Sequence, residues 1–200
     1  DKKWLVEWDT GLTHREYYMM ICGMTERHRK TLAAINRNTK EIEEYAFTTK
    51  RGDAIGFTIS VDRAKRDSCK HLALKSLPNS VESIGDGAFL GCESLALTSL
   101  PHSLTTIGEI AFSGCTSLAL TSLPHSLTTI GWSAFSGCTS LALTSLPHSL
   151  ESIGPEAFSR CTSLKSTTLP NSLESIGSDA FFGCTSLARI SLPHNPTSLP

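Results

Sequence analysis

The hydrophobic positions of this chain repeat with a fixed period over most of its length. An Ile-Gly pair recurs every 23 residues, and an Ala-Phe pair and a cysteine follow each copy at constant distances. A period of about 20 to 50 residues is typical of chains that stack short structural units into a solenoid. The isoleucines are Ile84, Ile107, Ile130, Ile153 and Ile176, and the cysteines are Cys69, Cys92, Cys115, Cys138, Cys161 and Cys184.

A unit this short cannot bury its own apolar face, so the units before and after it must cover that face. The pattern predicts one short strand per turn, around segments such as Ala119 to Leu123, paired in parallel with the next turn. Ala88-Phe89 and its equivalents are expected to place a large anchor in a brief helical or irregular turn. Gly85 and its equivalents are expected to permit a tight bend.

The full unit reads Leu-Pro-x-Ser-Leu-x-x-Ile-Gly-x-x-Ala-Phe-x-x-Cys-x-Ser-Leu, followed by four residues. Copies start at Leu77, Leu100, Leu123, Leu146 and Leu169. This unit resembles the BspA-type, or Treponema pallidum-type, leucine-rich repeat. The resemblance implies an α/β repeat solenoid, a right-handed leucine-rich-repeat array with parallel strands. It also implies a role in adhesion or protein binding, which is common in bacterial and protist surface proteins.

Three segments are expected: a non-repeat flank over 1–68, the repeat array over 69–193, and a proline-containing tail over 194–200. The flank carries most of the charge and several aromatic residues, and we interpret it as strand-rich, with one short helix at Tyr17 to Cys22 as the alternative. Its expected role is to cover the open apolar end of the array. The segment Gly56 to Val61 is a candidate for pairing with the first repeat.

Three copies depart from the family pattern in the returning strand. They carry a threonine where the family has an inward-pointing apolar residue, and an extra leucine one position earlier. Either the strand shifts so that these leucines point inward, or they form an exposed apolar strip that a partner would cover. The leucines are Leu97, Leu120 and Leu143.

The recurring cysteines and histidines each permit a chemical and a structural interpretation. Equivalent cysteines point the same way, and no Cys-x2-Cys spacing occurs, so we interpret them as small buried thiols rather than disulfides or metal ligands. The histidines His102, His125 and His148 follow a turn proline and are replaced by asparagine in other units. A solvated polar turn is the favoured interpretation, with a pH-sensitive or metal-binding stripe as the alternative.

One two-residue position varies while its surroundings stay fixed. The units starting at Leu100 and Leu123 differ only there, with Glu109-Ile110 in one and Trp132-Ser133 in the other. Such variation predicts exposure. Trp132 is therefore a candidate contact anchor, since tryptophan is enriched at interaction hot spots; the alternative is a tolerated surface substitution.

Composition narrows the function classes. The chain has 18 Lys and Arg against 19 Asp and Glu, so nothing electrostatic favours nucleic acid as a partner. No apolar run is long enough to span a membrane, and no catalytic motif or cofactor-binding motif is present. We therefore expect a non-catalytic protein-binding module without cofactor or metal; the alternative is a permanent structural subunit of a larger assembly. Free thiols favour an intracellular site, whereas the family resemblance implies a cell-surface one.

Overall fold

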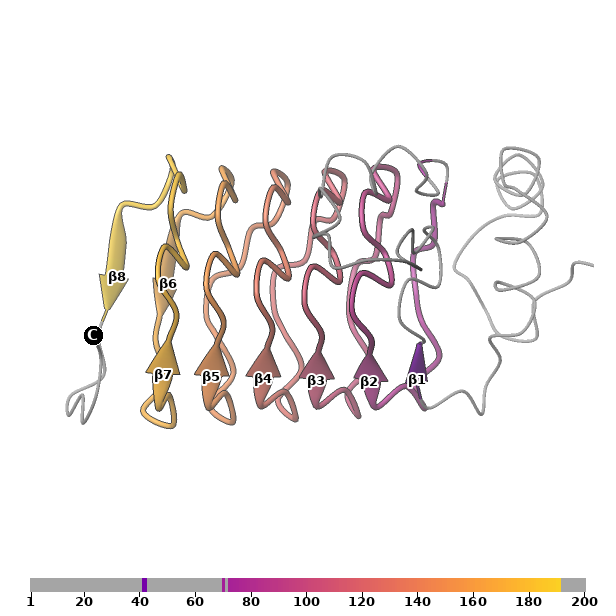
Figure 1. Cartoon of the computed structure of the whole chain (residues 1–200), viewed down its shortest axis with the longest axis horizontal. Helices are drawn as coiled ribbons and strands as arrows, with labels where there is room; N and C mark the ends of the chain where they lie inside the picture. The colour runs from indigo at the N-terminus through magenta and orange to yellow at the C-terminus, as the bar shows by residue number, and fades with distance from the viewer. Residues whose placement is uncertain (1–40, 43–69, 71, 192–200) are drawn as a thin grey trace, which may run out of the picture.

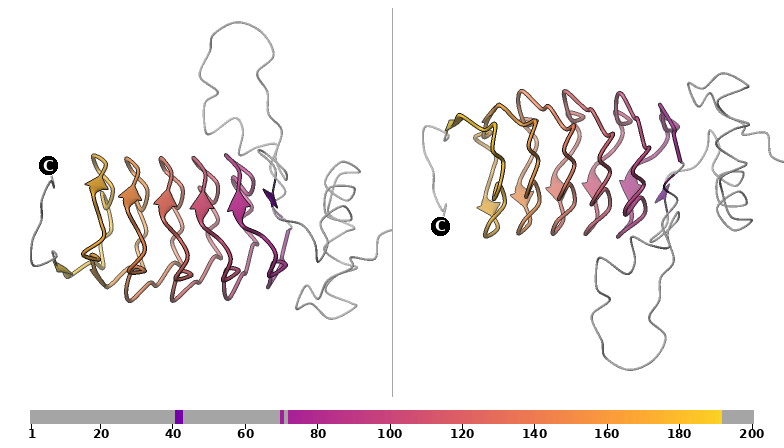
Figure 2. Two further views of the ribbon diagram at one scale, coloured as in Figure 1. Left: turned by 90° about the horizontal axis from the view of Figure 1, so that it is seen from below. Right: turned by 90° about the horizontal axis from the view of Figure 1, so that it is seen from above.

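The computed structural model describes residues 41–42, 70 and 72–191, and these form a solenoid of stacked turns (Figure 1). Six strands form one parallel sheet in the order β1-β2-β3-β4-β5-β7, and β6 pairs in parallel with β8. The turns follow one another along a single axis in all three views (Figures 1 and 2). The strands are β1 Glu41–Ile42, β2 Ser83–Ile84, β3 Thr106–Ile107, β4 Thr129–Ile130, β5 Ser152–Ile153, β6 Ser166–Thr168, β7 Ser175–Ile176 and β8 Arg189–Ser191.

In β2 to β5 the main sheet is built from dipeptides in which a partly buried Ser or Thr precedes an isoleucine. In β7 that serine is exposed, and in β1 a glutamate takes its place. Each isoleucine pairs in register with its equivalent one turn on, as Ile84 does with Ile107. The glycine that follows extends the ladder, because the amide of Gly108 donates to the carbonyl of Ile84 at 2.8 Å. From β2 to β5 the isoleucine side chains are buried, which fixes the register of every turn.

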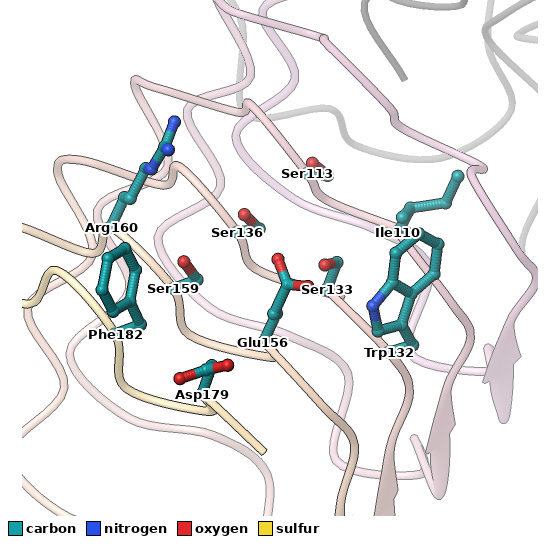
Figure 3. Close-up of a pocket in the computed structure, with 10 residues that line it drawn as sticks. All are labelled: Ile110, Ser113, Trp132, Ser133, Ser136, Glu156, Ser159, Arg160, Asp179 and Phe182. Carbon is teal, nitrogen blue, oxygen red and sulfur yellow. The ribbon is translucent and has the colours of Figure 1, made fainter. Parts of the chain in front are cut away.

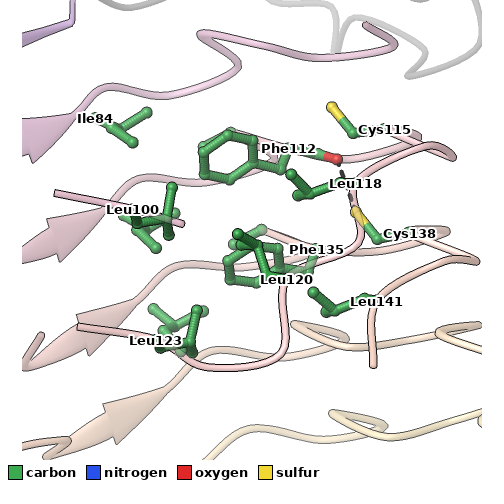
Figure 4. Packing of buried hydrophobic residues seen from close by; sticks show 14 of the residues in the cluster. Ile84, Leu100, Phe112, Cys115, Leu118, Leu120, Leu123, Phe135, Cys138 and Leu141 are labelled. Atoms are coloured by element: carbon green, nitrogen blue, oxygen red, sulfur yellow. Dashed lines mark hydrogen bonds between the residues drawn. The ribbon is translucent and has the colours of Figure 1, made fainter. Parts of the chain in front are cut away.

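The core is a set of columns that run along the solenoid axis (Figure 4). Phenylalanine rings stack from turn to turn with centroids 5.3 to 5.4 Å apart, and leucines, alanines and cysteines pack beside them. No single turn could bury these rings alone, so the stacking predicted from the period is confirmed. The rings belong to Phe89, Phe112, Phe135, Phe158 and Phe181.

From Gly108 to Gly177, the glycine after the isoleucine is required by close packing of backbones. A Cβ atom at Gly154 would lie 2.6 Å from the amide nitrogen of Trp132, and one at Gly108 would lie 2.7 Å from that of Asp86. Distances this short are repulsive. The bend expected from Gly85 and its equivalents is therefore better explained by contact between neighbouring turns. Left-handed glycines occur later in the unit, as at Gly114 with φ of 75°.

The segment after each main-sheet strand is a series of turns, and the described residues contain no helix. Of the two forms expected here, the irregular turn is the one that occurs, because left-handed residues exclude a helix: Gly87 has φ of 57° and Gly91 has φ of 67°. Their amides also donate to the next turn of the solenoid, as does Phe89, whose amide reaches the carbonyl of Ala111 at 2.8 Å. This arc of the chain therefore forms a second ladder between turns.

The predicted strand at Ala119 to Leu123 is also a correction, since no strand forms there. The equivalent segments form strands only at the end of the array, as β6 and β8. In the earlier turns the hydrogen bonding is displaced: the amide of Ala142 donates to Leu120, one residue beyond its equivalent, whereas Ala188 donates to its equivalent Lys165. The strand shift that the sequence offered as one alternative is thus visible in the backbone.

This shift buries the extra leucines. Leu97, Leu120 and Leu143 are at most 2% exposed and belong to the core, while the threonines after them are exposed. A partner cannot reach these leucines, so their selection as interaction residues was wrong. Of the two alternatives, the one in which the leucines point inward is correct. Their burial removes an exposed apolar strip that would favour aggregation.

Part of the flank joins the sheet. Glu41–Ile42 pairs with β2, and buried Ile42 accepts a hydrogen bond from Gly85 as later isoleucines do from their glycines. The sequence carries a signal for this position, because Ile42 precedes Ala46-Phe47 with the spacing of a normal repeat. The predicted helix or strands at Tyr17 to Cys22 and Gly56 to Val61, and the segment 194–200, lie outside the described residues.

Candidate binding groove

A groove of about 420 Å³ runs across four consecutive turns on the arc that follows the main-sheet strands (Figure 3). Its floor consists of residues that directly follow the core phenylalanines, and its wall consists of residues from the variable two-residue position. Volumes of this size are typical of ligand pockets. The lining residues are Ile110, Ser113, Trp132, Ser133, Ser136, Glu156, Ser159, Arg160, Asp179 and Phe182.

The wall of the groove has a left-handed backbone. Ile110, Ser133, Glu156 and Asp179 occupy one position of successive turns, with φ between 48° and 57°. Arg160 has φ of 59° at a place where the other turns have glycine. A non-glycine residue in this conformation costs about 1 kcal/mol or more, and such strain is most often found at functional positions. The wall is therefore held in a conformation that its side chains do not favour by themselves.

The floor of the groove is a column of serines. Ser113 and Ser159 are only 2% and 3% exposed, and Ser136 between them is partly buried. Their side chains lie in a row along the groove (Figure 3). Within the part of the chain that the structure describes, the hydroxyl groups of these three serines form no hydrogen bond. A buried hydroxyl without a partner is unfavourable, so this column requires bound water or a ligand.

A second serine column shows what a purely structural serine does in this fold. Ser126 and Ser149 follow the turn proline, and their hydroxyls donate at 2.7 Å to the carbonyls of Leu104 and Leu127 in the preceding turn. Ser103 and Ser172 form the same bond. These serines recur because each one ties a turn to its neighbour. The groove serines recur in three consecutive units, but their hydroxyls tie no turn to its neighbour within the described residues.

Aromatic and charged side chains border the serine floor. Trp132 is 37% exposed at one end, and Phe182 is 60% exposed at the other (Figure 3). Glu156, Asp179 and Arg160 are exposed around them, and within the described residues none of the three forms an ion pair. The groove thus combines apolar ends with free donors and acceptors, which is the composition of a recognition site.

In the turns that form the groove, the variable position is exposed except at Ile110 and Ser133. Trp132, Glu109, Pro155 and Ser178 are exposed as expected, but Ile110 is only 8% exposed, which corrects the expectation for that residue. Glu109 lies outside the groove lining, and its backbone amide donates to the carboxylate of Asp86 at 2.7 Å.

The histidines lie elsewhere. His102, His125 and His148 are exposed in the turns that precede the strands, and the last two line a separate hollow of about 270 Å³. Among the described residues, no group of three or more His, Cys, Asp or Glu is arranged to hold a metal ion. The exposure of the three histidines is what a solvated polar turn requires.

The cysteines are buried free thiols in every described turn. From Cys115 to Cys184 each Sγ donates to the carbonyl of a phenylalanine, as Cys138 does to Phe112 at 3.1 Å (Figure 4). Burial raises the pKa of the Cys161 thiol well above its ordinary value of 9.0, and it raises the pKa of Cys184 as well. The neutral thiol is the stable form, so these groups fill space and are poor nucleophiles.

Several groove residues were not identified from the sequence: the three floor serines, Glu156, Arg160, Asp179 and Phe182. One signal could have indicated the floor. The residue after the core phenylalanine is Leu90 in the first full unit and Phe182 in the last, but serine in the three between. Serine in three consecutive units, with apolar residues at the same position in the first and last units, points to a local change in environment.

Parallel strands stacked at a 23-residue period over a core of leucine, isoleucine and phenylalanine define the class of leucine-rich-repeat solenoids. The model of the BspA type leucine rich repeat region matches residues 67–188 in six copies. Because this match covers more than half of the chain, the chain belongs to that family, as the repeat unit predicted.

One solved structure agrees with this assignment. The chain is 45% identical to the leucine-rich repeat protein of T. pallidum, with a TM-score of 0.52, over 58% of this chain and 54% of that one. A leucine-rich repeat protein of Bacteroides ovatus is 34% identical over 60% of this chain and 37% of that one, with a TM-score of 0.43. The chain thus spans about half the length of the T. pallidum protein and a smaller share of the Bacteroides ovatus protein. No curated protein matches the chain.

Over the described ranges, the structure contains no helix with the length and hydrophobicity needed to cross a membrane.

Proposed function

We propose that the chain is a non-catalytic binding module that docks a partner protein on the face that carries the groove. The family to which it belongs is generally associated with protein binding and adhesion. The observation that supports this face is the pair of exposed aromatic side chains, Trp132 and Phe182, at the two ends of one groove. Exposed aromatics in a hollow with a polar rim are typical of interaction hot spots.

Rigidity supports the same proposal. The groove residues are held by the ladder between turns, as in the 2.8 Å bond from the amide of Phe135 to the carbonyl of Ala157. A preorganised surface loses little conformational entropy on binding.

The alternative, a permanent structural subunit, would hide an exposed leucine strip and Trp132 in a large interface. Leu97, Leu120 and Leu143 are buried in the core, so of these residues only Trp132 is left for such an interface.

Photo-crosslinking tests the docking face. A photoreactive amino acid is placed at Trp132, at Phe182 or, as a control, at exposed His125, and adducts formed in extracts of the natural source are identified by mass spectrometry. The captured protein is then purified and its affinity measured. We expect adducts from positions 132 and 182 only, and at least tenfold weaker binding by the Trp132→Ala/Phe182→Ala double variant. Adducts from position 125 alone, or unchanged affinity, would contradict the proposal.

A further inference from the structure

The groove serines are the least explained polar groups of the described chain. Ser113 and Ser159 are more than nine-tenths buried, and among the residues that the structure describes their hydroxyls have no partner, although they line an open hollow. In Figure 3 these side chains and that of Ser136 form one row along the groove. A ligand that supplies hydrogen bonds there would satisfy three groups at once.

The other free groups define what this ligand must offer. Glu156 and Asp179 only accept hydrogen bonds, Arg160 and the Trp132 indole only donate them, and the serine hydroxyls do both. One cation and two anions leave little net charge in the groove. The matching ligand is therefore uncharged and carries many groups that both donate and accept, as a polyhydroxylated chain does.

The ends of the groove favour a ligand with flat apolar faces. Trp132 and Phe182 present exposed aromatic rings there. The C–H faces of a pyranose ring pack on aromatic rings, while its hydroxyl edges remain free to form hydrogen bonds. A sugar ring thus satisfies the aromatic ends and the hydroxyl floor together.

The geometry of the floor points to an extended chain of sugars. Each floor serine follows a phenylalanine, and consecutive rings are 5.3 to 5.4 Å apart. The hydroxyls therefore recur at about the length of one pyranose unit in an extended β-1,4-linked chain. An α-1,4-linked chain curves away from such a straight row.

An extended peptide fits the groove less well. Strand addition requires unpaired backbone amides and carbonyls, but the amides of Phe112 and Phe135 already donate to the next turn at 2.8 Å. Peptide anchors also need apolar pockets, whereas the middle of this floor consists of hydroxyl groups.

We infer that the groove binds a β-1,4-linked glycan, with Ser113, Ser136 and Ser159 hydrogen-bonded to its hydroxyls and Trp132 stacked on a ring. This inference rests on the proposed function insofar as the glycan is the part of the partner protein that enters the groove.

Titration calorimetry on the full chain with cellotetraose and chitotetraose tests the inference, with maltotetraose as the control that differs from cellotetraose only in anomeric configuration. At least one β-linked tetrasaccharide is expected to bind, and to bind at least tenfold more tightly than maltotetraose. The Ser113→Ala/Ser136→Ala/Ser159→Ala variant is expected to lose at least tenfold in affinity and to retain its unfolding midpoint. Ser126→Ala is the matched control: it removes a bond between turns, so it lowers the midpoint and leaves affinity unchanged.

Three results would overturn the glycan assignment: no binding of either β-linked tetrasaccharide, equal binding of maltotetraose, or unchanged affinity in the triple serine variant. Enzymatic deglycosylation of the crosslinked partner separates this inference from the proposed function. Loss of binding after deglycosylation supports both. Retained binding that still depends on Trp132 and Phe182 leaves the docking face standing and refutes the glycan, in favour of a peptide surface.

Discussion

The amide of Gly131 donates a 2.8 Å hydrogen bond to the carbonyl of Ile107, one turn earlier in the solenoid. The two backbones approach so closely that a Cβ atom on Gly131 would lie 2.7 Å from the amide nitrogen of Glu109. This approach recurs at each turn that follows, and it sets the spacing at which the core columns stack.

Gly131→Ala is therefore expected to destabilise the fold by about 3 kcal/mol or more, because the clash involves backbone atoms that cannot turn aside. Gly137→Ala is the matched control. Gly137 is left-handed with φ of 72°, but its nearest neighbour would be 3.8 Å from the new Cβ, so only backbone strain of about 1 to 2 kcal/mol is expected. Urea unfolding measures both values, and equal losses would show that close approach is not what requires Gly131.

The period alone was sufficient to predict the solenoid, its parallel strands and its phenylalanine core, because every unit meets the same neighbours. It could not place the strands. In this turn Thr106–Ile107 forms the strand, and the predicted segment Ala119 to Leu123 does not. The extra leucines displace the hydrogen bonds between turns in the segments equivalent to Ala119 to Leu123. The strand prediction failed at the positions where the chain departs from its family pattern.

The groove was only partly predictable, for a related reason. Trp132 was identified because its position varies between otherwise identical units. Ser113 and Ser126 look alike in sequence, since both recur every 23 residues. Only the backbone path reveals that Ser126 donates to Leu104 while Ser113 has no partner among the described residues. Hydrogen-bond satisfaction is a property of three-dimensional placement, which periodicity does not report.

The buried leucine column gives a second prediction. Leu120→Ala removes a side chain that is 0% exposed and leaves a cavity, so a loss of about 2 to 5 kcal/mol is expected. Thr121→Ala alters the exposed neighbour and should change the free energy of unfolding by about 0.5 kcal/mol or less. Thermal or urea unfolding compares the two. A larger loss of stability in the Thr121 variant would mean that Thr121, and not Leu120, points into the core.

The first strand gives a third prediction, because Ile42 extends the isoleucine column of the main sheet. Ile42→Ala should cost about 2 to 5 kcal/mol, as expected for a buried isoleucine. Val61→Ala provides the comparison, since Val61 lies one repeat length before Ile84 in the sequence. If Val61→Ala destabilises the chain and Ile42→Ala does not, the pairing of Ile42 with β2 is wrong. The segment that ends at Val61, one period before Ile84, would then be the neighbour of β2.

The thiols predict how stability depends on pH. The pKa values of Cys161 and Cys184 are raised in the folded state by burial, from an ordinary value of 9.0. Above about pH 9 the unfolded thiols release protons that the folded thiols retain, so the folded state binds more protons and the free energy of unfolding falls as pH rises. Each such thiol is expected to lower it by up to about 1.4 kcal/mol per pH unit.

Urea unfolding between pH 7 and pH 10.5 measures this slope, and Cys161→Ala is the informative variant. Its loss of stability at neutral pH reflects the missing side chain, but its decline above pH 9 should be shallower than that of the parent chain. Tyrosines and lysines titrate in the same range, so the difference between the two slopes is the quantity to compare. Parallel slopes would mean that Cys161 ionises as readily in the folded chain as in the unfolded one, and the buried-thiol assignment would then be wrong.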